Sequence, residues 1–340
     1  MSFWEKLFSE KKMVLGLSPM DGVTDVAMRY MTTKYSNPDV LFTEFVSIDA
    51  LHYATEERRE RLLKTFMRAR DVHALERGSD TAAAPRRSSY EIAQVFGHKP
   101  ELFAEAAELV ESLGFDGIDI NMGCPMHKVE DQGSGAGLIR TPKLAQEIIK
   151  TVMAHTKLPV SVKTRIGVDR DVSEEWMEVL CEVHPANISL HGRTLRQLYQ
   201  GSADWEAIGR AAMVVHKHGG HILGNGDIDS VASAKLKVES YGVDGVLIGR
   251  GAEGNPGVFK TNREPSKEQR LEWMVEHAKF FEQIFGQCHS DTMTQSRAFM
   301  PMRKHLAWYC KGFEGAVEMR TKLMLTNNAD EVRKIVEEII

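Results

Sequence analysis

The chain has 340 residues, of which 42% are hydrophobic and 27% are charged, and this composition is that of a globular protein with a sizeable core. Its formal net charge of -5 at pH 7 by itself argues against a nucleic-acid partner. The N-terminal residues lack the apolar stretch of a signal peptide, and no later segment is apolar for about 18 residues, so we expect a cytoplasmic protein with no membrane partner.

Eight short apolar runs, rich in β-branched residues, recur along the first part of the chain. Near-continuous apolarity predicts strands covered on both faces, as in a parallel sheet. Most runs are followed by a helix-like pattern, and eight βα units in about 250 residues make a (β/α)8 TIM barrel. A doubly wound sheet is the alternative, but its glycine-rich turn is missing after the first run. The runs are residues 14–20, 40–46, 92–97, 117–123, 160–167, 187–193, 221–227 and 245–251.

Helix signals lie between the runs. Thr141-Pro142 supplies an N-cap and a proline at the first helical position, and residues 204–215 and 230–238 show shorter helical patterns. The connection between the second and third runs is long, at about 45 residues. It holds a basic run at 57–70, with six Arg or Lys against two Glu, and an Ala-, Pro- and Ser-rich stretch at 79–89. We expect an extra helix and then a mobile loop there, on the active-site face.

After about residue 262 the strand pattern stops, and residues 266–340 show helical patterns only. Pro265 breaks the chain and Ser266 supplies an N-cap at this point. We therefore expect two domains, a barrel over residues 1–262 and an all-helical C-terminal domain over residues 263–340.

A cysteine stands at the end of the fourth run, in the segment Asp119-Ile120-Asn121-Met122-Gly123-Cys124-Pro125. The C-terminal edge of a parallel sheet carries the chemistry in barrel enzymes, so Cys124 is a candidate acid or nucleophile. A buried apolar role is the ordinary one for a cysteine, and we keep it for Cys181, Cys288 and Cys310. The four cysteines share no metal-ligand or redox spacing, which predicts free thiols in a reducing compartment and no structural metal.

The last two runs end in Gly224-Asn225-Gly226-Asp227 and Gly249-Arg250-Gly251. Barrel enzymes commonly hold a phosphate at these two loops, where glycines let backbone N–H groups approach an anion and an arginine pairs with it. Glycine at either turn alone has a conformational explanation. Together the two turns predict a phosphorylated ligand.

Three polar residues stand in apolar surroundings at other strand ends. Lys163 either pairs with an acid structurally or stabilises negative charge on a cofactor, because an unpaired buried ammonium is costly. His191 is either a hydrogen-bonded core residue or a ligand-binding one. Gln94 can both donate and accept. Facing a phosphate loop, this set suits a planar heterocycle with a phosphorylated tail, and FMN fits that description.

Seven motifs, taken in order, give the chain a family resemblance. They are residues 18–25, Gln94-Val95-Phe96-Gly97, the Cys124 segment followed by Lys128-Val129, Val162 to Gly167, His191-Gly192-Arg193-Thr194, Asn225-Gly226-Asp227 and Gly249-Arg250. Over about residues 14–260 the chain resembles the dihydrouridine synthases, and residues 302–309 resemble the helical RNA-binding domain of that family. The resemblance implies a flavoenzyme that uses NADPH to reduce FMN and then reduces a uridine in tRNA to 5,6-dihydrouridine.

The resemblance also implies roles for individual residues. Cys124 would be the acid that protonates the pyrimidine, since a thiol with a pKa about 8.5 stays mostly protonated at neutral pH. Asn121 would orient the uracil. The cofactor would be bound by Pro19, Met20 and Asp21 through the main chain, by Gln94 and Lys163 at the flavin edge, by His191 near the ring, and by Asn225, Gly226, Asp227, Gly249 and Arg250 at the phosphate.

RNA would be gripped mainly by the helical domain, because a base on the flavin has left its stack. The candidate cations lie in its stretch 295–325 and are Arg297, Arg303, Lys304, Lys311, Arg320 and Lys322. Arg165 and the basic run 57–70 are further candidates, although a solvated helix face explains that run equally well. The long segment 50–90 and Glu130-Asp131 depart from the family pattern and bear on which RNA is the substrate.

We expect a monomer. Three alternatives stay open: the same reaction on ribosomal RNA, a flavin barrel oxidoreductase acting on a free dihydroorotate-like pyrimidine, and an RNA-binding protein with an inactive barrel.

Overall fold

A computed structural model of the chain describes residues 1–72, 89–126, 130, 132–260, 264–286 and 298–338. Nearly all of the loop expected at 79–89 lies outside these residues, as do Lys128-Val129, Cys288, Arg297 and the proposed domain boundary at 262–263.

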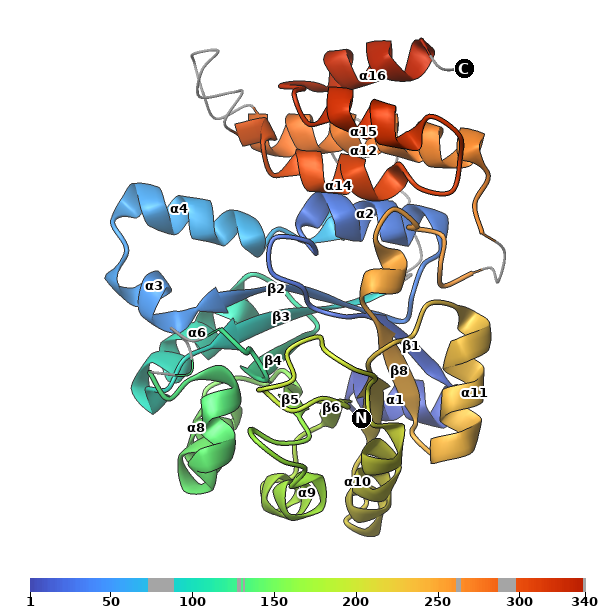
Figure 1. Cartoon of the computed structure of the whole chain (residues 1–340). Coiled ribbons are helices and arrows are strands. Elements are labelled where there is room, and N and C mark those ends of the chain that lie inside the picture. Colours follow the sequence, from blue (N-terminus) through green and yellow to red (C-terminus); the bar gives the residue numbers. More distant parts are fainter. Residues whose placement is uncertain (73–88, 127–129, 131, 261–263, 287–297, 339–340) are drawn as a thin grey trace.

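Eight parallel strands form a closed barrel in the order β1 to β8, which confirms the expected TIM-barrel fold (Figure 1). Every strand falls within or beside one predicted run. Each ends short of its run, except β2, because the last residues of the runs are glycines and polar residues of the following turns. The strands are β1 (Val14–Leu17), β2 (Val40–Ser47), β3 (Tyr90–Phe96), β4 (Gly117–Met122), β5 (Val160–Arg165), β6 (Asn187–His191), β7 (Ile222–Asn225) and β8 (Gly245–Ile248).

Helices surround the barrel and pack against it. In α8 (Pro142–Ala154) the buried residues include Ile148, Ile149 and Val152. Thr141 occupies the N-cap position as expected, but its side chain makes no capping hydrogen bond. The other helices of this layer are α2 (Val26–Tyr35), α6 (Pro100–Ser112), α9 (Ser173–Cys181), α10 (Trp205–Lys217) and α11 (Val231–Tyr241), with short 3-10 helices η1 (Gly135–Arg140) and η2 (Arg250–Ala252).

The N-terminal helix α1 (Phe3–Glu10) closes the bottom of the barrel. Trp4, which is fully buried, packs with Leu7 against side chains from β1, β2, β3, β7 and β8. This end of the barrel is therefore a packed core, and the opposite end is the one that opens to solvent.

The connection after β2 contains two short helices, α3 (Ile48–Tyr53) and α4 (Glu56–Thr65), where one was expected. Ser47 caps α3 with its side chain, and Ala54 is extended and separates the two. No residue of α4 is buried, so this helix projects from the barrel beside the C-terminal helices (Figure 1).

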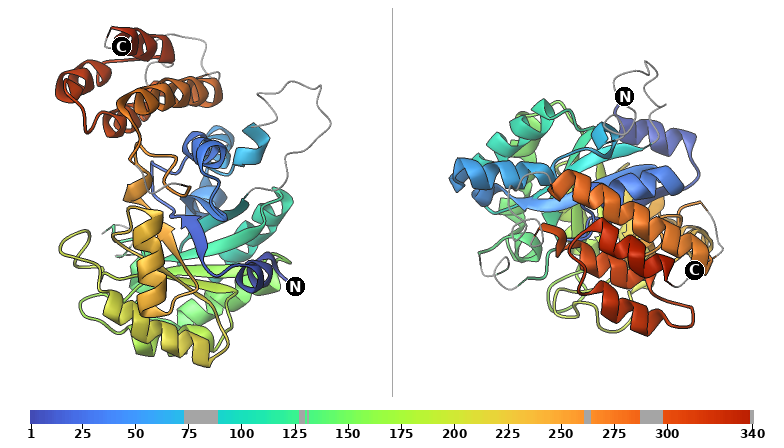
Figure 2. Two further views of the ribbon diagram at one scale, coloured as in Figure 1. Left: turned by 90° about the vertical axis from the view of Figure 1, so that its right-hand side faces the viewer. Right: turned by 90° about the horizontal axis from the view of Figure 1, so that it is seen from above.

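Residues after 266 form four described helices, as predicted: α12 (Lys267–Phe285), α14 (Met302–Tyr309), α15 (Ala316–Leu323) and α16 (Ala329–Glu337). They stack over α2 and form a separate lobe above the barrel (Figure 2). Ser266 caps α12 by accepting the N–H of Gln269 at 3.2 Å. The lobe and α2 share one apolar core, in which the ring centroids of Tyr30 and Phe280 are 4.1 Å apart. None of the helices described here is long and apolar enough to cross a membrane.

Candidate active site

A cavity of about 980 Å³ opens at the C-terminal end of the barrel and falls within the size range of cofactor and ligand sites. It is bounded by the turns after most strands and by residues near the helical lobe. Most of the site residues predicted from sequence line it: Pro19, Met20, Asp21, Asn121, Cys124, Lys163, Arg165, His191, Asn225, Gly226, Asp227, Gly249 and Arg250.

Cys124 lies in a turn that is held from two sides. Asn121 Oδ1 accepts the backbone N–H of Gly123 at 3.0 Å and that of Cys124 at 2.8 Å. Arg165 Nε donates to the carbonyl oxygen of Gly123 at 2.8 Å. Burial raises the pKa of the Cys124 thiol, with Asp21 acting in the same direction. The thiol is therefore protonated at neutral pH and suits a proton donor better than a nucleophile.

Arg165, which is predicted to contact RNA, has several bonds within the protein. It is 3% exposed, and besides Gly123 its guanidinium donates to the carbonyl oxygens of Thr194 and Leu198. Burial lowers the pKa of Arg165 to about 10, and the side chain remains charged at neutral pH. A buried guanidinium with three carbonyl partners ties the turns after β4 and β6 together while still lining the cavity.

Gln94, which is predicted to bind the flavin edge, bonds to two other side chains in the structure. Its side chain is fully buried and is not among the residues that line the cavity. Nε2 donates to Asp119 Oδ2 at 2.6 Å, and Oε1 accepts from Asn121 Nδ2 at 2.9 Å. Gln94 thus sits one layer below the cavity floor, bonded to the residue that holds Cys124.

Lys163 projects from β5 into the cavity wall. Nζ donates to Asn225 Oδ1 at 3.1 Å, and no carboxylate of the described residues forms an ion pair with it. Burial and the nearby Arg165 lower the pKa of Lys163 to about 8, against the opposite pull of Asp119. A structural ion pair with an acid therefore does not explain Lys163. Its ammonium can stabilise an anion in the cavity.

His191 is a neutral imidazole in a cationic corner. Its pKa lies well below the usual value because of burial and the charges of Arg165, Lys163, Arg193 and Arg250. Arg193 Nη1 lies 3.3 Å from His191 Nε2 and can only donate. Nε2 is then the acceptor, which leaves the proton on Nδ1.

Asp227 joins the turns after β6, β7 and β8. Its carboxylate accepts from Arg193 at 2.7 and 2.9 Å, from Arg250 at 2.7 Å and from the N–H of Ala203 at 2.8 Å. Burial opposes ionisation, but these donors outweigh it and lower the pKa of Asp227. A charged carboxylate repels phosphate, so the side chain of Asp227 orients Arg250, and only its backbone is suited to the anion.

Two glycines allow the strand-end turns to approach each other closely. A Cβ atom at Gly226, which has φ of +123°, would lie 2.6 Å from the Cβ of Ala203 and 3.1 Å from His191 Cδ2. A Cβ atom at Gly249 would lie 3.2 Å from Met20 Sδ. Both contacts are tighter than side chains normally allow, which is the condition for backbone to line an anion site.

The helical lobe reaches the cavity rim through α14 and the residues that follow it. The Lys304 ammonium lies over Gly22 in the turn after β1, where a Cβ atom would come within 2.4 Å of it. Lys311 lines the cavity, and its Nζ donates to the carbonyl oxygen of Glu253 at 3.3 Å. Below them, His305 Nε2 lies 3.5 Å from the buried carboxylate of Asp25.

Two other cations predicted to bind RNA have structural partners. Arg303 donates to the carbonyl oxygen of Thr326 at 2.9 Å and to Asn327 Oδ1 at 3.0 Å. Arg320 donates to the carbonyl oxygen of Cys310 at 2.6 Å, although it remains exposed. Arg303 therefore braces the lobe, and Lys304 and Lys311 are better placed for a substrate in the cavity.

The basic run 57–70 is not uniformly available either. Arg68 bonds to Asp71 and to the carbonyl of Gly114, and Arg70 bonds to the same carbonyl and to Asp116. The cations that remain exposed lie on α4, where the acidic residues Glu56, Glu57 and Glu60 accompany them.

Tyr199 and Glu253 are among the cavity residues that sequence reasoning missed. Tyr199 is 63% exposed at the mouth of the cavity, and the guanidinium carbon of Arg250 lies 5.5 Å from the centre of its ring. Glu253 follows η2, and burial raises its pKa. Tyr199 could have been suspected because it lies eight residues after His191, in a loop at the end of a strand. No feature of the sequence pointed to Glu253.

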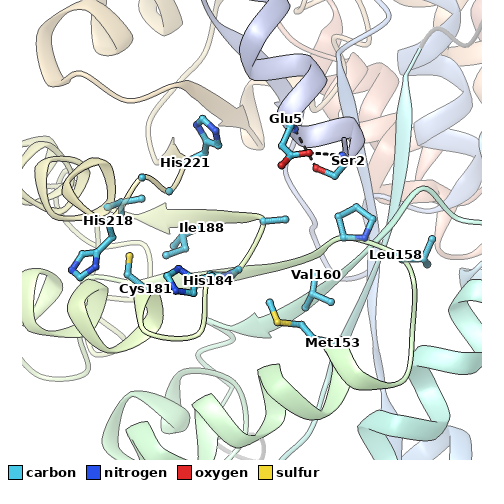
Figure 3. A pocket seen from close by; sticks show the side chains of 16 residues that line it. Ser2, Glu5, Met153, Leu158, Val160, Cys181, His184, Ile188, His218 and His221 are labelled. Carbon is cyan, nitrogen blue, oxygen red and sulfur yellow. Dashed lines mark hydrogen bonds between the residues drawn. The ribbon is translucent and has the colours of Figure 1, made fainter.

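A second cavity of about 420 Å³ lies at the other end of the barrel (Figure 3). It is lined by residues near the starts of β5, β6 and β7 and by Ser2 and Glu5 of the N-terminus. Its imidazoles do not converge: His184, His218 and His221 stand apart in Figure 3. Within the described residues, no group of three acidic, histidine or cysteine side chains is arranged to hold a metal ion.

Comparisons with known proteins agree with the sequence motifs. A family model described as "Dihydrouridine synthase (Dus)" matches residues 16–340. A probable tRNA-dihydrouridine synthase 1 of Synechocystis sp. is 33% identical over 335 residues, covering 95% of this chain and 85% of that protein. A probable tRNA-dihydrouridine synthase of Staphylococcus aureus is 33% identical over 341 residues, covering 99% and 95%. A probable tRNA-dihydrouridine synthase 2 of Bacillus subtilis is also 33% identical over 341 residues, covering 99% and 96%.

Proposed function

The chain belongs to the dihydrouridine synthase family, and from this membership we propose that it reduces a uridine of tRNA to 5,6-dihydrouridine with FMN as cofactor and NADPH as reductant. The proposal makes Cys124 the catalytic acid. It assigns the barrel to flavin binding and catalysis and the helical lobe to RNA binding.

The observation that carries the proposal is the protonated thiol of Cys124 in the wall of the large cavity. Reduction of the pyrimidine double bond adds a hydride to one carbon and a proton to its neighbour. Cys124 supplies that proton, and its raised pKa keeps the proton available at neutral pH. Asn121 and Arg165 hold the turn so that the thiol stays at the wall.

The residues around the cavity fit FMN. The turns at Gly226 and Gly249, with Arg250 beside them, suit a phosphate. Lys163 places a positive charge where an anionic reduced flavin requires one, and His191 offers an N–H. When bound, FMN supplies the hydride chemistry that protein side chains lack.

The rim of the cavity fits a nucleic acid better than a free pyrimidine. Lys311 and Arg250 line the cavity, and Lys304 lies over Gly22, between the lining residues Asp21 and Val23. Both lysines come from the helical lobe, which a small-molecule enzyme would not need. Cations at the rim bind phosphates flanking a base that has left its stack.

The experiment compares total tRNA from cells with and without the gene, with dihydrouridine mapped by position. We expect at least one position to lose the modification, and the wild-type gene to restore it. Purified protein from the same cells is examined for a flavin absorption spectrum and for the mass of the released cofactor. NADPH oxidation by the protein is followed with and without unmodified tRNA.

Each alternative has its own result. Loss of dihydrouridine from ribosomal RNA alone would move the substrate to that RNA. An unchanged modification pattern in both RNAs, with flavin-dependent reduction of a free pyrimidine, would support the small-molecule reading. A purified chain that binds tRNA but releases no flavin would support the inactive barrel.

A further inference from the structure

Three polar residues form a hydrogen-bonded row inside the barrel, beneath the cavity. Strand register places Gln94 opposite Asp119, and Asp119 opposite Ser161, on adjacent strands. Ser161 Oγ donates to Asp119 Oδ1 at 2.6 Å, and Gln94 Nε2 donates to Asp119 Oδ2 at 2.6 Å. The side chains of Gln94, Asp119 and Ser161 are fully buried, and they bond to one another.

The row continues upward to the catalytic turn. Gln94 Oε1 accepts from Asn121 Nδ2 at 2.9 Å, and Asn121 Oδ1 accepts the N–H groups of Gly123 and Cys124. An unbroken chain of hydrogen bonds therefore joins the carboxylate of Asp119 to the backbone of Cys124, through two side-chain amides.

The ionised carboxylate of Asp119 fixes which group donates and which accepts in each of these hydrogen bonds. An ionised carboxylate can only accept, so the Gln94 amide must turn its nitrogen toward Asp119 and its oxygen toward Asn121. That oxygen in turn draws the nitrogen of Asn121, which leaves the Asn121 oxygen facing the turn. If the Asn121 amide were reversed, its nitrogen would face two backbone N–H groups, and both hydrogen bonds of the turn would be lost.

We propose that Asp119, acting through the amides of Gln94 and Asn121, is the positioning residue that fixes the Cys124 thiol for proton transfer. The inference rests on the proposed function for its catalytic meaning. Asp119 touches neither the cavity nor the turn, and it acts only through the orientation of its neighbours.

Burial, two hydrogen bonds and one nearby charge act on the ionisation of Asp119. Burial raises the pKa of Asp119 to about 6, while hydrogen bonds from Ser161 and Gln94 and the charge of Lys163 favour the ionised form. Lys163 is the charged side chain that acts on it from β5. At neutral pH the carboxylate is mostly ionised, which is the state that the row requires.

The row can be broken and rebuilt by substitution. Gln94→Met has a similar shape but no amide, so Asn121 loses its orienting partner. The double variant Gln94→Glu with Asp119→Asn exchanges acid and amide between the two positions. The amide nitrogen now at position 119 then donates to the carboxylate at position 94, and the other oxygen of that carboxylate accepts from Asn121. Ser161 still donates to the oxygen at position 119, so the direction at Asn121 is unchanged.

Thr43→Val is the matched control for these variants. Thr43 Oγ1 accepts the backbone N–H of Gln94 at 3.0 Å without joining the row. Its loss therefore perturbs β3 at Gln94 from the β2 side while leaving the orientation of both amides as it was.

The experiment measures how fast iodoacetamide alkylates Cys124 in the purified full-length protein, by mass spectrometry of the Cys124 peptide. Uridine reduction and cofactor content are measured beside it. We expect Gln94→Met to change the alkylation rate about fivefold and to lower kcat at least as much, without changing KM for RNA. The double variant returns the alkylation rate and kcat toward their wild-type values, and Thr43→Val changes neither the rate nor kcat.

Two results would overturn the proposal. The first is a Gln94→Met protein with an unchanged Cys124 alkylation rate, including one that only loses cofactor, which would make Gln94 a cofactor ligand. The second is a double variant that is folded, as shown by its circular dichroism and melting temperature, but no closer to wild type than Gln94→Met. Alkylation needs neither RNA nor cofactor, so failure of the proposed function leaves this test standing.

Discussion

Asn121 holds Cys124 through one side-chain oxygen, which accepts the N–H of Cys124 at 2.8 Å and that of Gly123 at 3.0 Å. Asn121→Ala removes both hydrogen bonds while leaving the thiol in the chain. We expect uridine reduction to fall about 10- to 100-fold, since two hydrogen bonds of about 1 kcal/mol each are lost. Asn121→Asp keeps the oxygen that accepts from the turn but sets a second acceptor against Gln94 Oε1, so it should recover only part of the activity in single-turnover assays. Equal activity of Asn121→Ala and wild type would remove Asn121 from the site.

Cys124→Ala tests the proton donor directly. The thiol is not needed to hold any of the residues proposed to bind the cofactor, so we expect the variant to retain flavin and flavin-dependent NADPH oxidation. Uridine reduction should fall by at least about 100-fold, the ordinary contribution of a general acid. Cys181→Ala, in a buried thiol of α9, is the control and should keep full activity. Loss of flavin from Cys124→Ala would mean that the thiol is structural.

Lys163→Gln removes the cation that faces the cavity without changing the length of the side chain greatly. We expect a more negative flavin reduction potential and weaker flavin retention, because negative charge on the reduced cofactor loses its counter-charge. Flavin content and the reduction potential report the change. Lys150→Gln, on the exposed face of α8, is the control. Wild-type potential and flavin content in Lys163→Gln would contradict this role.

RNA contacts of the lobe are tested at Lys304, whose ammonium lies over Gly22 at the cavity rim. If it neutralises one phosphate, Lys304→Gln should weaken tRNA binding and reduce the slope of log Kd against log salt by about 1. Filter binding over a salt series gives both numbers. Lys235→Gln, on the far helix α11, should leave the slope unchanged.

The helix α4 gives a separate RNA prediction. Charge reversal at Arg58 and Arg61, which are both exposed, should weaken tRNA affinity if this projecting helix contacts the substrate. The same salt series measures it. Unchanged affinity would mean that the basic run 57–70 is a solvated helix face. In the second half of the run, Arg68 and Arg70 already bond to protein groups, which favours that explanation.

Acid sensitivity of the helical lobe is predicted from His277. Burial and the neighbouring His305 lower the pKa of His277 to about 3, against 6.5 in an unfolded chain. Below pH 6.5 the unfolded state binds a proton that the folded state refuses, so the free energy of unfolding falls as the pH falls, by up to about 1.4 kcal/mol per unit. His277→Phe should flatten this slope in urea titrations between pH 7 and 4, whereas the exposed His184→Asn should not.

Much of the fold could be predicted from the sequence. Each strand is an apolar run that ends in glycine or polar residues, and such runs are needed wherever both faces of a strand are covered. Eight of them, spaced for intervening helices, leave few alternatives to a closed barrel. The helical tail was equally readable, because Ser266 and the helical spacing after it are local signals.

The sequence predicted which residues stand near the candidate site, but it did not predict the contacts between them. Cys124, Lys163 and the turns at Gly226 and Gly249 were placed at the cavity by their positions at strand ends, since parallel strands end at one edge. Gln94 and Arg165 stand at the same edge and were assigned to cofactor and RNA. The structure shows contacts that the sequence did not reveal: Gln94 bonds to Asp119 and Asn121, and Arg165 bonds to backbone carbonyls while lining the cavity.

The sequence by itself thus determined the barrel, the helical lobe and which residues stand at the catalytic edge, because hydrophobic periodicity and turn residues are local properties. Only the tertiary structure decided which of those polar side chains face the cavity and which satisfy one another. A buried donor or acceptor must find a partner, and that partner is set by strand register and packing between residues far apart in the chain. The hydrogen-bonded row that runs from Ser161 through Asp119, Gln94 and Asn121 to Cys124 spans three strands and exists only once β3, β4 and β5 are aligned.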